Sequence, residues 1–293
     1  LGAMNPPPID RNPFRPDLLK GRTLLITGGG TGLGRAMALK CASLGAAVGV
    51  VGRREDPLRG VVEEIGKTGG RAAFAPCDVR ESASVVKAFD AIEGSLGPLD
   101  SLVNNAAGNF LCASEDLSDN AFDAVVKIVL YGSFNCTREL GRRLIARQAP
   151  GHVLSIVTTY VTSGSACVLP SAAAKAGVLA IMRSLAVEWA TYGIRLNAIA
   201  PGPFPTEGAF SRLMAGDMEK QALRRVPAGR FGDHAELANL AAYLLSDASP
   251  YQTGDCVTID GAEALFSGQE FAGFAHMDRA AAKQAMGALK PRK

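Results

Sequence analysis

Tyr160, Ser171 and Lys175 are the side chains in this sequence best suited to proton transfer at a carbonyl oxygen. Ser171 and Lys175 are four residues apart in a predicted helix that continues to Ala190, so they share one helical face. A tyrosine hydroxyl can donate a hydrogen bond to a developing oxyanion, and a nearby lysine ammonium favours that charge. The alternative interpretation is that Tyr160 is an aromatic residue at the edge of the core and Lys175 is a surface charge.

A second candidate site is a glycine-rich turn between a predicted strand and a helical pattern. Glycines let the backbone turn tightly and approach a pyrophosphate, whose charge is held by amides at the helix N-terminus. The spacing is G-x-x-x-G-x-G, and glycine also serves plain tight turns. The position between strand and helix nevertheless predicts a dinucleotide site. The expected cofactor contacts are Gly28, Gly30, Thr31, Gly32, Leu33 and Gly34.

Arg53 and Arg54 follow the second predicted strand, about 20 residues beyond the glycines. An enzyme that uses NAD places an acidic residue there for the ribose 2′-hydroxyl, whereas arginine suits a 2′-phosphate. The sequence therefore predicts NADPH as the cofactor. The alternative is a solvated first helical turn, although cations at a helix N-terminus are mildly unfavourable without a ligand. After the third strand, Asp78 is a candidate acceptor for the adenine amino group or a helix cap.

The fourth predicted strand runs into a segment of small and amide side chains, Asn104–Phe110. Small residues allow the backbone to approach a cofactor ribose closely. The paired asparagines can tie neighbouring loops together or donate to a ligand. Asn105, Ala106 and Ala107 are therefore candidate cofactor contacts.

The elements that must position these residues are seven short apolar runs that alternate with helix-length stretches from Arg22 onward. This alternation predicts right-handed βαβ crossovers and an α/β, single-domain Rossmann fold: a doubly wound parallel sheet of about seven strands with helices on both faces. In such a sheet the ligand lies beyond the carboxyl ends of the strands, near the point where strand order reverses. The predicted strands are Thr23–Thr27, Ala47–Val51, Ala72–Ala75, Leu99–Asn104, Val153–Thr158, Arg195–Ala200 and Cys256–Ile259.

The expected domain organisation is one catalytic domain over residues 17–265. Residues 1–16 are expected to form a flexible N-terminal arm, in which Leu1–Ala3 is a remnant of cloning before Met4. Residues 266–293 form a C-terminal extension. The segment Phe204–Pro227 lacks clear sheet periodicity, which predicts a loop or helical lid over the site.

Composition excludes several classes of protein. The 31 basic and 28 acidic residues are mixed along the chain, so no nucleic-acid footprint is visible. No apolar run approaches the roughly 20 residues that span a bilayer, and no signal peptide or transit peptide is evident. The six cysteines lie far apart without metal-ligand spacing, which predicts free thiols and no metal. We expect a cytoplasmic protein of bacterial type that binds neither nucleic acid nor membranes.

Over roughly residues 17–261 the sequence resembles the short-chain dehydrogenase/reductase family. The resemblance rests on the glycine turn, the segment after the fourth strand, Lys175 on its helix and the run Asn197–Pro203. Most members carry Tyr-x-x-x-Lys, whereas Ser171 stands at the tyrosine position here. That departure is similar to the NADPH-dependent 2,4-dienoyl-CoA reductases of the mitochondrial type. In that branch the tyrosine comes from the segment before the serine, which Tyr160 matches.

This resemblance implies reduction of a 2,4-dienoyl-CoA to a 3-enoyl-CoA in the β-oxidation of unsaturated fatty acids. Hydride would reach C5 of the acyl-CoA thioester, and Tyr160 and Asn109 would hydrogen-bond the thioester oxygen. Lys175 would hold the nicotinamide ribose, with Ser171 in a supporting contact. The resemblance also implies cofactor contacts from Pro201, Gly202 and Phe204, an acyl channel lined by Phe110 and Ser118, and CoA phosphates held by Arg80 and Arg212. The two arginines could equally be solvated charges.

Two other functions stay open on sequence grounds. The first is another reductase of the family that acts on a 3-oxoacyl-CoA or a carbonyl substrate, and the second is a catalytically silent dinucleotide-binding protein. The family resemblance also implies a homotetramer, and we expect the helices around Phe122–Ile145 and Ser171–Ala190 to form its larger interface. The helix after Ser171 presents an apolar stripe that either forms a subunit interface or packs on the sheet. Its members are Val178, Ile181, Leu185 and Trp189.

Overall fold

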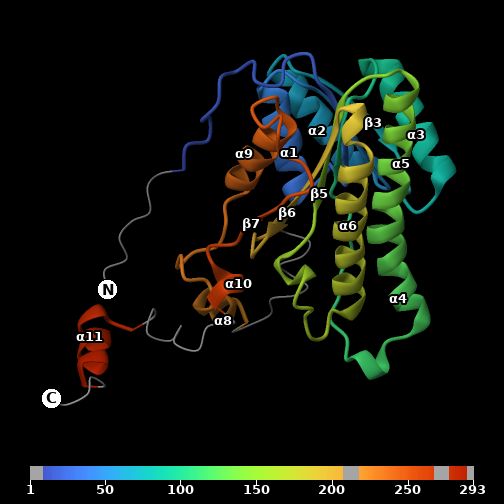
Figure 1. Cartoon of the computed structure of the whole chain (residues 1–293). Helices are drawn as coiled ribbons and strands as arrows, with labels where there is room; N and C mark the ends of the chain where they lie inside the picture. Colours follow the sequence, from blue (N-terminus) through green and yellow to red (C-terminus); the bar gives the residue numbers. More distant parts are fainter. Residues whose placement is uncertain (1–8, 207–217, 267–276, 289–293) are drawn as a thin grey trace.

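The computed structural model describes residues 9–206, 218–266 and 277–288, and its centre is a seven-stranded parallel sheet (Figure 1). The strand order is β3-β2-β1-β4-β5-β6-β7, so the order reverses between β1 and β4. All seven predicted strands are confirmed, with ends that shift by up to two residues. The strands are β1 Thr23–Thr27, β2 Ala47–Gly52, β3 Arg71–Pro76, β4 Ser101–Asn104, β5 Gly151–Ile156, β6 Ile194–Pro201 and β7 Cys256–Ile259.

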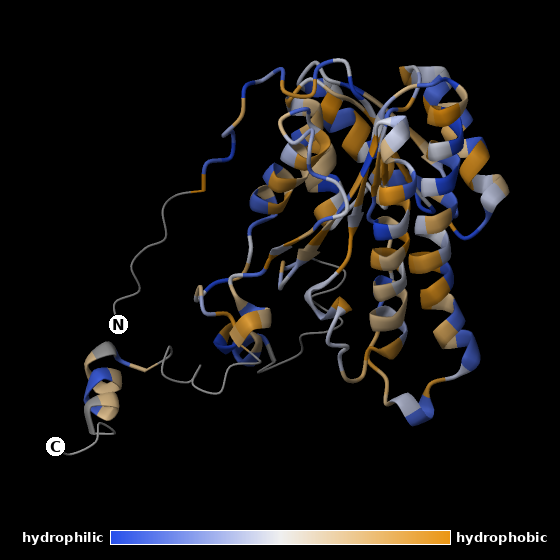
Figure 2. Ribbon diagram, in the orientation of Figure 1, coloured by the Kyte–Doolittle hydropathy of each residue, from blue (hydrophilic) through white to orange (hydrophobic). Residues whose placement is uncertain are grey.

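Helices cover both faces of this sheet, and successive strand residues point into two separate cores. Leu24 and Ile26 of β1 pack with α1, α2 and α9, whereas Leu25 packs with α3, α5 and α6 on the opposite face. The flanking helices carry hydrophobic and hydrophilic residues on the same ribbon, as expected of helices with one face on a sheet (Figure 2). They are α1 Gly32–Ser43, α2 Glu55–Lys67, α3 Ser82–Leu96, α4 Asp119–Val126, α5 Gly132–Ala146, α6 Leu169–Glu188 and α9 His234–Leu245.

Shorter elements complete the described chain. A π-helical turn, Lys127–Tyr131, joins α4 to α5, and a 3-10 turn, Thr159–Val161, follows β5. Two further 3-10 turns are Ser114–Asp116 and Ala190–Tyr192, and the remaining α-helices are α8 Met218–Arg224, α10 Glu263–Phe266 and α11 Arg279–Ala288. None of the helices in the described ranges combines the length and hydropathy that crossing a bilayer requires.

The described part of the N-terminal arm contacts the domain. Arg11 forms an ion pair of 2.8 Å with Asp233 at the start of α9, and the Asn239 amide donates to the Asp10 carbonyl at 3.0 Å. The Lys40 ammonium of α1 donates to the Arg11 carbonyl at 2.5 Å. Residues 10 and 11 therefore lie against α1 and α9.

The apolar stripe of α6 divides between two environments. Val178 and Trp189 are buried in the core of their own chain. The Trp189 ring fills the space beside Gly141 of α5, where a Cβ atom would lie 2.3 Å from it. Ile181 and Leu185 are half-buried, and Val187 is 80% exposed. The prediction that the stripe forms a subunit interface is therefore wrong for Val178 and Trp189, because these two residues pack between α6, α5 and the sheet.

His152 gives the fold a testable dependence on pH. It lies in β5 between Ser101 of β4 and Arg195 of β6, and its side chain is buried. Burial, followed by the charges of Arg195 and Arg22, lowers its pKa to about 3. The pKa of an unfolded histidine is about 6.5. Between these two pKa values the unfolded chain therefore binds a proton that the folded chain does not. Proton binding stabilises the unfolded chain, so the free energy of unfolding decreases as the pH falls through this range.

We expect the free energy of unfolding to fall, through this group alone, by about 1.4 kcal/mol per pH unit between about pH 6 and pH 4. Urea unfolding of the wild type and of His152→Gln at several pH values measures the effect. The variant has no imidazole to protonate, so its stability should decline less steeply. Equal slopes for the two proteins would contradict this role of His152.

Candidate active site

The glycine turn between β1 and α1 depends on positions that have no side chain. Gly28 and Gly32 have φ values of 63° and 53°, a backbone region that favours glycine. A Cβ atom on Gly34 would lie 2.3 Å from the Gly28 carbonyl oxygen and 2.5 Å from the Asn105 Nδ2 atom. The first turn of α1 contains no acidic residue, and the Thr31 side chain does not cap it. The amides of this helix start are therefore suited to an anion.

A hydroxyl and an amide join the glycine turn to the loop after β4. Thr27 Oγ1 accepts hydrogen bonds from the backbone N–H groups of Asn105 and Ala106, each at 3.0 Å. The Asn105 amide donates to the carbonyls of Thr27 and Gly28 at 3.0 and 3.2 Å. Of the two roles considered for the paired asparagines, the structure thus gives Asn105 the joining one. Thr27 is a positioning residue that sequence reasoning missed, although a hydroxyl residue directly before the glycines is a usable signal.

Asn104 holds the end of β4 from within the core. Its amide donates to Thr137 Oγ1 of α5 at 2.8 Å and to Ser155 Oγ of β5 at 3.4 Å. These contacts hold the carboxyl end of β4, and Asn105 and Asn109 belong to the loop that follows it. The carboxyl ends of β1, β4 and β5 therefore meet beside the point where the strand order reverses.

Arg53 and Arg54 lie at the carboxyl end of β2, and both are exposed. Arg54 is the residue before α2, whose first turn contains Glu55 and Asp56. Within the described parts of the chain, neither arginine has a carboxylate at ion-pair distance. Two guanidinium groups beside the glycine turn are thus free to bind an anion.

Asp78 and Arg80, predicted to contact different ligands, bind each other. The Arg80 Nε atom donates to Asp78 Oδ1 at 2.9 Å, and its Nη2 atom lies 2.5 Å from Oδ2. This two-point contact holds the pKa of Asp78 below its ordinary value. Asp78 does not cap α3, because its Oδ1 accepts instead from the Arg80 backbone amide at 3.1 Å. A cofactor or CoA group at either residue has to compete with this pair.

Tyr160, Ser171 and Lys175 are brought together after β5. Tyr160 belongs to the 3-10 turn that follows the strand, and its hydroxyl lies 3.3 Å from Ser171 Oγ of α6. Lys175 lies one helical turn beyond Ser171, and both side chains are buried. The Lys175 ammonium donates to the carbonyl of Ile156, the last residue of β5. A phenol, a hydroxyl and an ammonium therefore converge at one strand end.

Lys175 is an electrostatically unusual lysine. Burial lowers its pKa from 10.5 to about 8, and no carboxylate in the described chain offsets this effect. Among the described residues, the hydrogen-bond partner of the ammonium is the Ile156 carbonyl oxygen. A buried cation in this state favours any negative charge that forms near it.

The other predicted substrate contacts have local roles in this structure. Asn109 is half-buried and its Oδ1 atom accepts from the Phe110 amide at 2.9 Å, which leaves its Nδ2 atom available as a donor. Phe110 is half-buried and packs against the core on the α3, α5 and α6 face of the sheet. Ser118 is exposed and caps α4 by accepting from the Ala121 amide at 3.3 Å. Arg212 lies outside the described residues.

The segment after β6 returns to the glycine turn. Pro201 ends β6, and Gly202 must be small, because a Cβ atom there would lie 2.6 Å from Asp260. The Phe204 ring is buried against Gly232, so only its backbone can meet a cofactor. Thr206 Cγ2 lies 3.2 Å from the position of a Cβ atom on Gly32, which makes Thr206 a second nearby residue that sequence reasoning missed.

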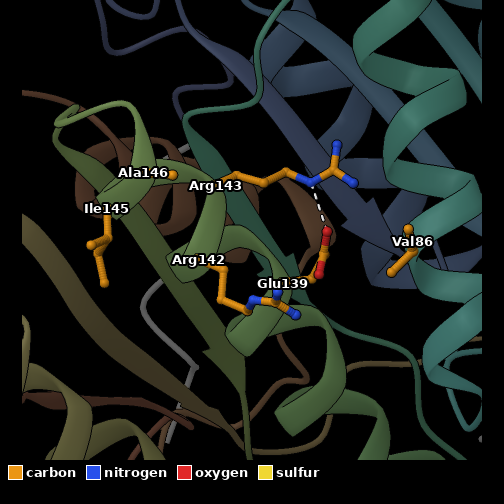
Figure 3. A pocket seen from close by; sticks show the side chains of 6 residues that line it. All are labelled: Val86, Glu139, Arg142, Arg143, Ile145 and Ala146. Atoms are coloured by element: carbon orange, nitrogen blue, oxygen red, sulfur yellow. Dashed lines mark hydrogen bonds and ion pairs between the residues drawn. The ribbon is translucent and has the colours of Figure 1, made fainter.

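Figure 3 shows a hollow elsewhere on the molecule, between α3 and the second half of α5. Its residues include Val86, Glu139 and Arg142, and α5 runs there toward the amino-terminal end of β5. None of the residues that line this hollow belongs to the candidate site. Across the described ranges, no group of three or more His, Cys, Asp or Glu residues could hold a metal ion.

Gly34→Ala tests the glycine turn. The added methyl group must displace the Gly28 carbonyl or the Asn105 amide, which we expect to destabilise the fold by about 1–3 kcal/mol and to weaken dinucleotide binding. Urea unfolding and NADPH fluorescence titration measure the two effects. Gly60→Ala in α2 is the matched control, since a Cβ atom there has nothing within 4 Å. Wild-type stability and affinity in Gly34→Ala would rule out this account of the turn.

Comparisons with known proteins agree with this geometry. The family model described as Enoyl-(Acyl carrier protein) reductase matches residues 28–262. A relative from Caenorhabditis elegans, named "Probable 2,4-dienoyl-CoA reductase 3" and described as (3E)-enoyl-CoA-producing, is 43% identical over 92% of this chain and 89% of its own. A relative from Bacillus subtilis, named "Probable 2,4-dienoyl-CoA reductase" and described as (2E)-enoyl-CoA-producing, is 43% identical over 84% of this chain and 98% of its own.

A solved structure with a bound dinucleotide is also similar. The gluconate 5-dehydrogenase from Burkholderia cenocepacia, in complex with NADP and tartrate, has a TM-score of 0.80 and 31% identity, and the match covers 85% of this chain and 98% of that one. The family model spans more than half of the chain, and the match includes the glycine turn, strands β2 to β7 and the lysine of α6. The chain therefore belongs to the short-chain dehydrogenase/reductase family of oxidoreductases.

Proposed function

We propose that this protein uses NADPH to reduce 2,4-dienoyl-CoA thioesters in the β-oxidation of unsaturated fatty acids. The observation that carries the proposal is the 3.3 Å contact between the Tyr160 hydroxyl and Ser171, one turn from the buried Lys175. The position four residues before the lysine is a serine, and the phenol comes from the preceding turn. The relatives named 2,4-dienoyl-CoA reductases support the same substrate class.

The residues divide the chemistry among them. NADPH, when bound, supplies the hydride that reduces the conjugated diene at C5. Tyr160 donates a hydrogen bond to the thioester oxygen as negative charge spreads to it, and Asn109 Nδ2 is the second donor. Lys175 stabilises that charge and holds the nicotinamide ribose. Ser171 positions the Tyr160 hydroxyl, and protonation of the substrate at C2 completes a 3-enoyl-CoA.

The cofactor is proposed to be NADPH because two exposed arginines, neither of which has an ion-pair partner among the described residues, stand beside the glycine turn. A guanidinium binds a 2′-phosphate through charge-assisted hydrogen bonds that the 2′-hydroxyl of NADH cannot offer. NADP in the similar gluconate dehydrogenase supports this preference. Phe110 and Ser118 would line the acyl channel, and Arg80 and Arg212 would hold CoA phosphates, Arg80 after release from Asp78.

Assembly as a homotetramer and a cytoplasmic location are part of the same proposal. The exposed Val187 and the half-buried Ile181 and Leu185 of α6 are suited to a subunit interface. The similar proteins come from a nematode and a bacterium, so their sources do not favour a bacterial origin for this chain.

The deciding experiment compares NADPH oxidation with a 2,4-dienoyl-CoA and with a 3-oxoacyl-CoA of equal chain length. We expect turnover of the dienoyl thioester alone, with the double-bond position of the product identified by mass spectrometry after derivatisation. A 3-enoyl product matches the proposal, and a 2-enoyl product corrects it. Turnover of the 3-oxoacyl thioester alone would favour a carbonyl reductase. NADPH binding without turnover of either would favour a dinucleotide-binding protein.

Tyr160→Phe removes only the hydroxyl that we place on the substrate oxygen. The expected result is a fall in kcat of about a hundredfold or more, the order seen when one oxyanion donor is lost, with NADPH affinity nearly retained. Ser171→Ala should cost less, and Lys175→Ala should reduce both turnover and NADPH affinity. Wild-type turnover in Tyr160→Phe together with an inactive Ser171→Ala would move the donor role to Ser171.

Arg53→Ala combined with Arg54→Ala tests the cofactor preference. Each charge-assisted contact to the 2′-phosphate contributes about 1.5–3 kcal/mol, so NADPH affinity should fall at least about tenfold while NADH affinity changes little. Both dissociation constants are measured at one salt concentration. Equal wild-type affinities for the two cofactors, or an unchanged ratio in the double variant, would exclude a role for these arginines.

NADPH affinity should also depend on pH through Lys175. Its pKa of about 8 means that the ammonium loses its proton as the pH rises through that value, and the hydrogen bonds that it donates to the ribose weaken with it. Fluorescence titrations between about pH 7 and pH 9.5 should therefore show weaker binding at high pH. Lys175→Arg stays protonated and should lack this dependence. A wild-type affinity for NADPH that stays constant across this pH range would contradict the role of Lys175.

A further inference from the structure

Cys112 and Cys167, which lie far apart in sequence, meet where two loops that carry residues of the candidate site contact each other. The Cys112 amide donates to the Cys167 carbonyl at 2.9 Å. Cys112 belongs to the loop after β4, two residues beyond Phe110, and Cys167 lies between Tyr160 and Ser171. The hydrogen-bonded atoms are each within two covalent bonds of their Cα atoms, so these Cα atoms lie no more than about 7 Å apart. Disulfides bridge Cα separations of about 4.4–6.8 Å.

These two thiols are also more accessible than three of the other cysteines. Cys167 is exposed and Cys112 is half-buried, whereas Cys41, Cys77 and Cys136 are buried. Burial raises the pKa of Cys41 to about 12 and that of Cys77 to about 11, which suppresses the reactive thiolate. Cys112 Sγ contacts the Ala113 carbonyl at 3.2 Å, so the sulfur lies on its own loop rather than in the core.

We propose that Cys112 and Cys167 form a reversible disulfide when a hydroperoxide oxidises the protein, and that this bond restrains the two loops that flank the substrate. The sulfur of Cys167 attacks a peroxide oxygen: an S–O bond forms, the O–O bond breaks, and with hydrogen peroxide water leaves. The Cys112 sulfur then attacks Cys167 Sγ, so that an S–S bond forms and the S–O bond breaks. A second water leaves with the Cys112 proton. The two thiols together lose two electrons, and the peroxide is reduced.

The consequence for turnover rests on the proposed function, whereas formation of the disulfide does not. The bond would join the segment that carries Asn109 and Phe110 to the segment that carries Tyr160 and Ser171. An acyl thioester that enters between these segments requires them to separate. The glycine turn and Arg53 belong to neither loop, and neither cysteine is among the residues that we place on the cofactor, so NADPH binding should be unaffected. The cross-link is thus expected to slow turnover and leave cofactor affinity unchanged.

The experiment treats the full-length protein with stoichiometric hydrogen peroxide, followed by alkylation, intact mass measurement and peptide mapping. We expect loss of two hydrogens per chain, a cross-linked peptide pair that contains Cys112 and Cys167, and reversal by dithiothreitol. Turnover of a long-chain 2,4-dienoyl-CoA should fall about fivefold or more, with the NADPH dissociation constant unchanged. Cys112→Ser and Cys167→Ser should each prevent the cross-link and the loss of turnover.

Cys256→Ser is the matched control, because Cys256 is a half-buried thiol outside these loops and its removal should leave the peroxide response intact. Oxidation of Cys167 to a sulfinic acid without a cross-link, or a disulfide between chains, would overturn the proposal. A mapped cross-link without loss of turnover would contradict the proposal that the disulfide restrains the two loops. If the untreated protein does not reduce a dienoyl-CoA, the proposed function fails while the mapped cross-link still decides the disulfide.

Discussion

The close approach of the β1–α1 turn to the loop after β4 is the constraint on which the rest of the site depends. Gly34 has no side chain, so the Gly28 carbonyl and the Asn105 amide both occupy the space where a methyl group would lie. Thr27 then binds two successive amides of the adjacent loop. Parallel pairing of β1 with β4 brings these groups to the same edge of the sheet. The start of α1, the small residues after β4 and the arginines after β2 thereby surround one region of space.

Most of the fold could be predicted because both faces of the sheet are buried. Such strands are nearly continuous apolar runs, and all seven were identifiable between helical stretches. Their ends were less predictable, since pairing with neighbours decides them. The β5 strand begins at Gly151, two residues before the predicted start, because Gly151 pairs with Ile194 and His152 pairs with Ser101.

The features that escaped the sequence all depend on contacts between distant or competing side chains. Asp78 and Arg80 had separate ligands in the prediction, yet they are two residues apart at a strand end and neutralise each other. Trp189 appeared to belong to an exposed stripe, because periodicity does not reveal that Gly141 of another helix leaves room for its ring. Cys112 and Cys167 meet only because the loops after β4 and β5 leave adjacent strands. The Trp189 and cysteine contacts do not follow from local spacing, and the short spacing of Asp78 and Arg80 does not reveal that they bind each other rather than a ligand.

The burial of Lys175 gives the candidate site an electrostatic preference for negative charge. A buried ammonium with one carbonyl partner is costly in the free protein, which is why its pKa lies near 8. A neighbouring carboxylate would remove this cost, but it would also neutralise the field at the Tyr160 hydroxyl. Because no such carboxylate lies beside Lys175 in the described chain, the reaction that we propose compensates the positive charge only as negative charge develops on the bound substrate. The interaction is therefore stronger in the transition state than in the ground state, and only that difference accelerates a reaction.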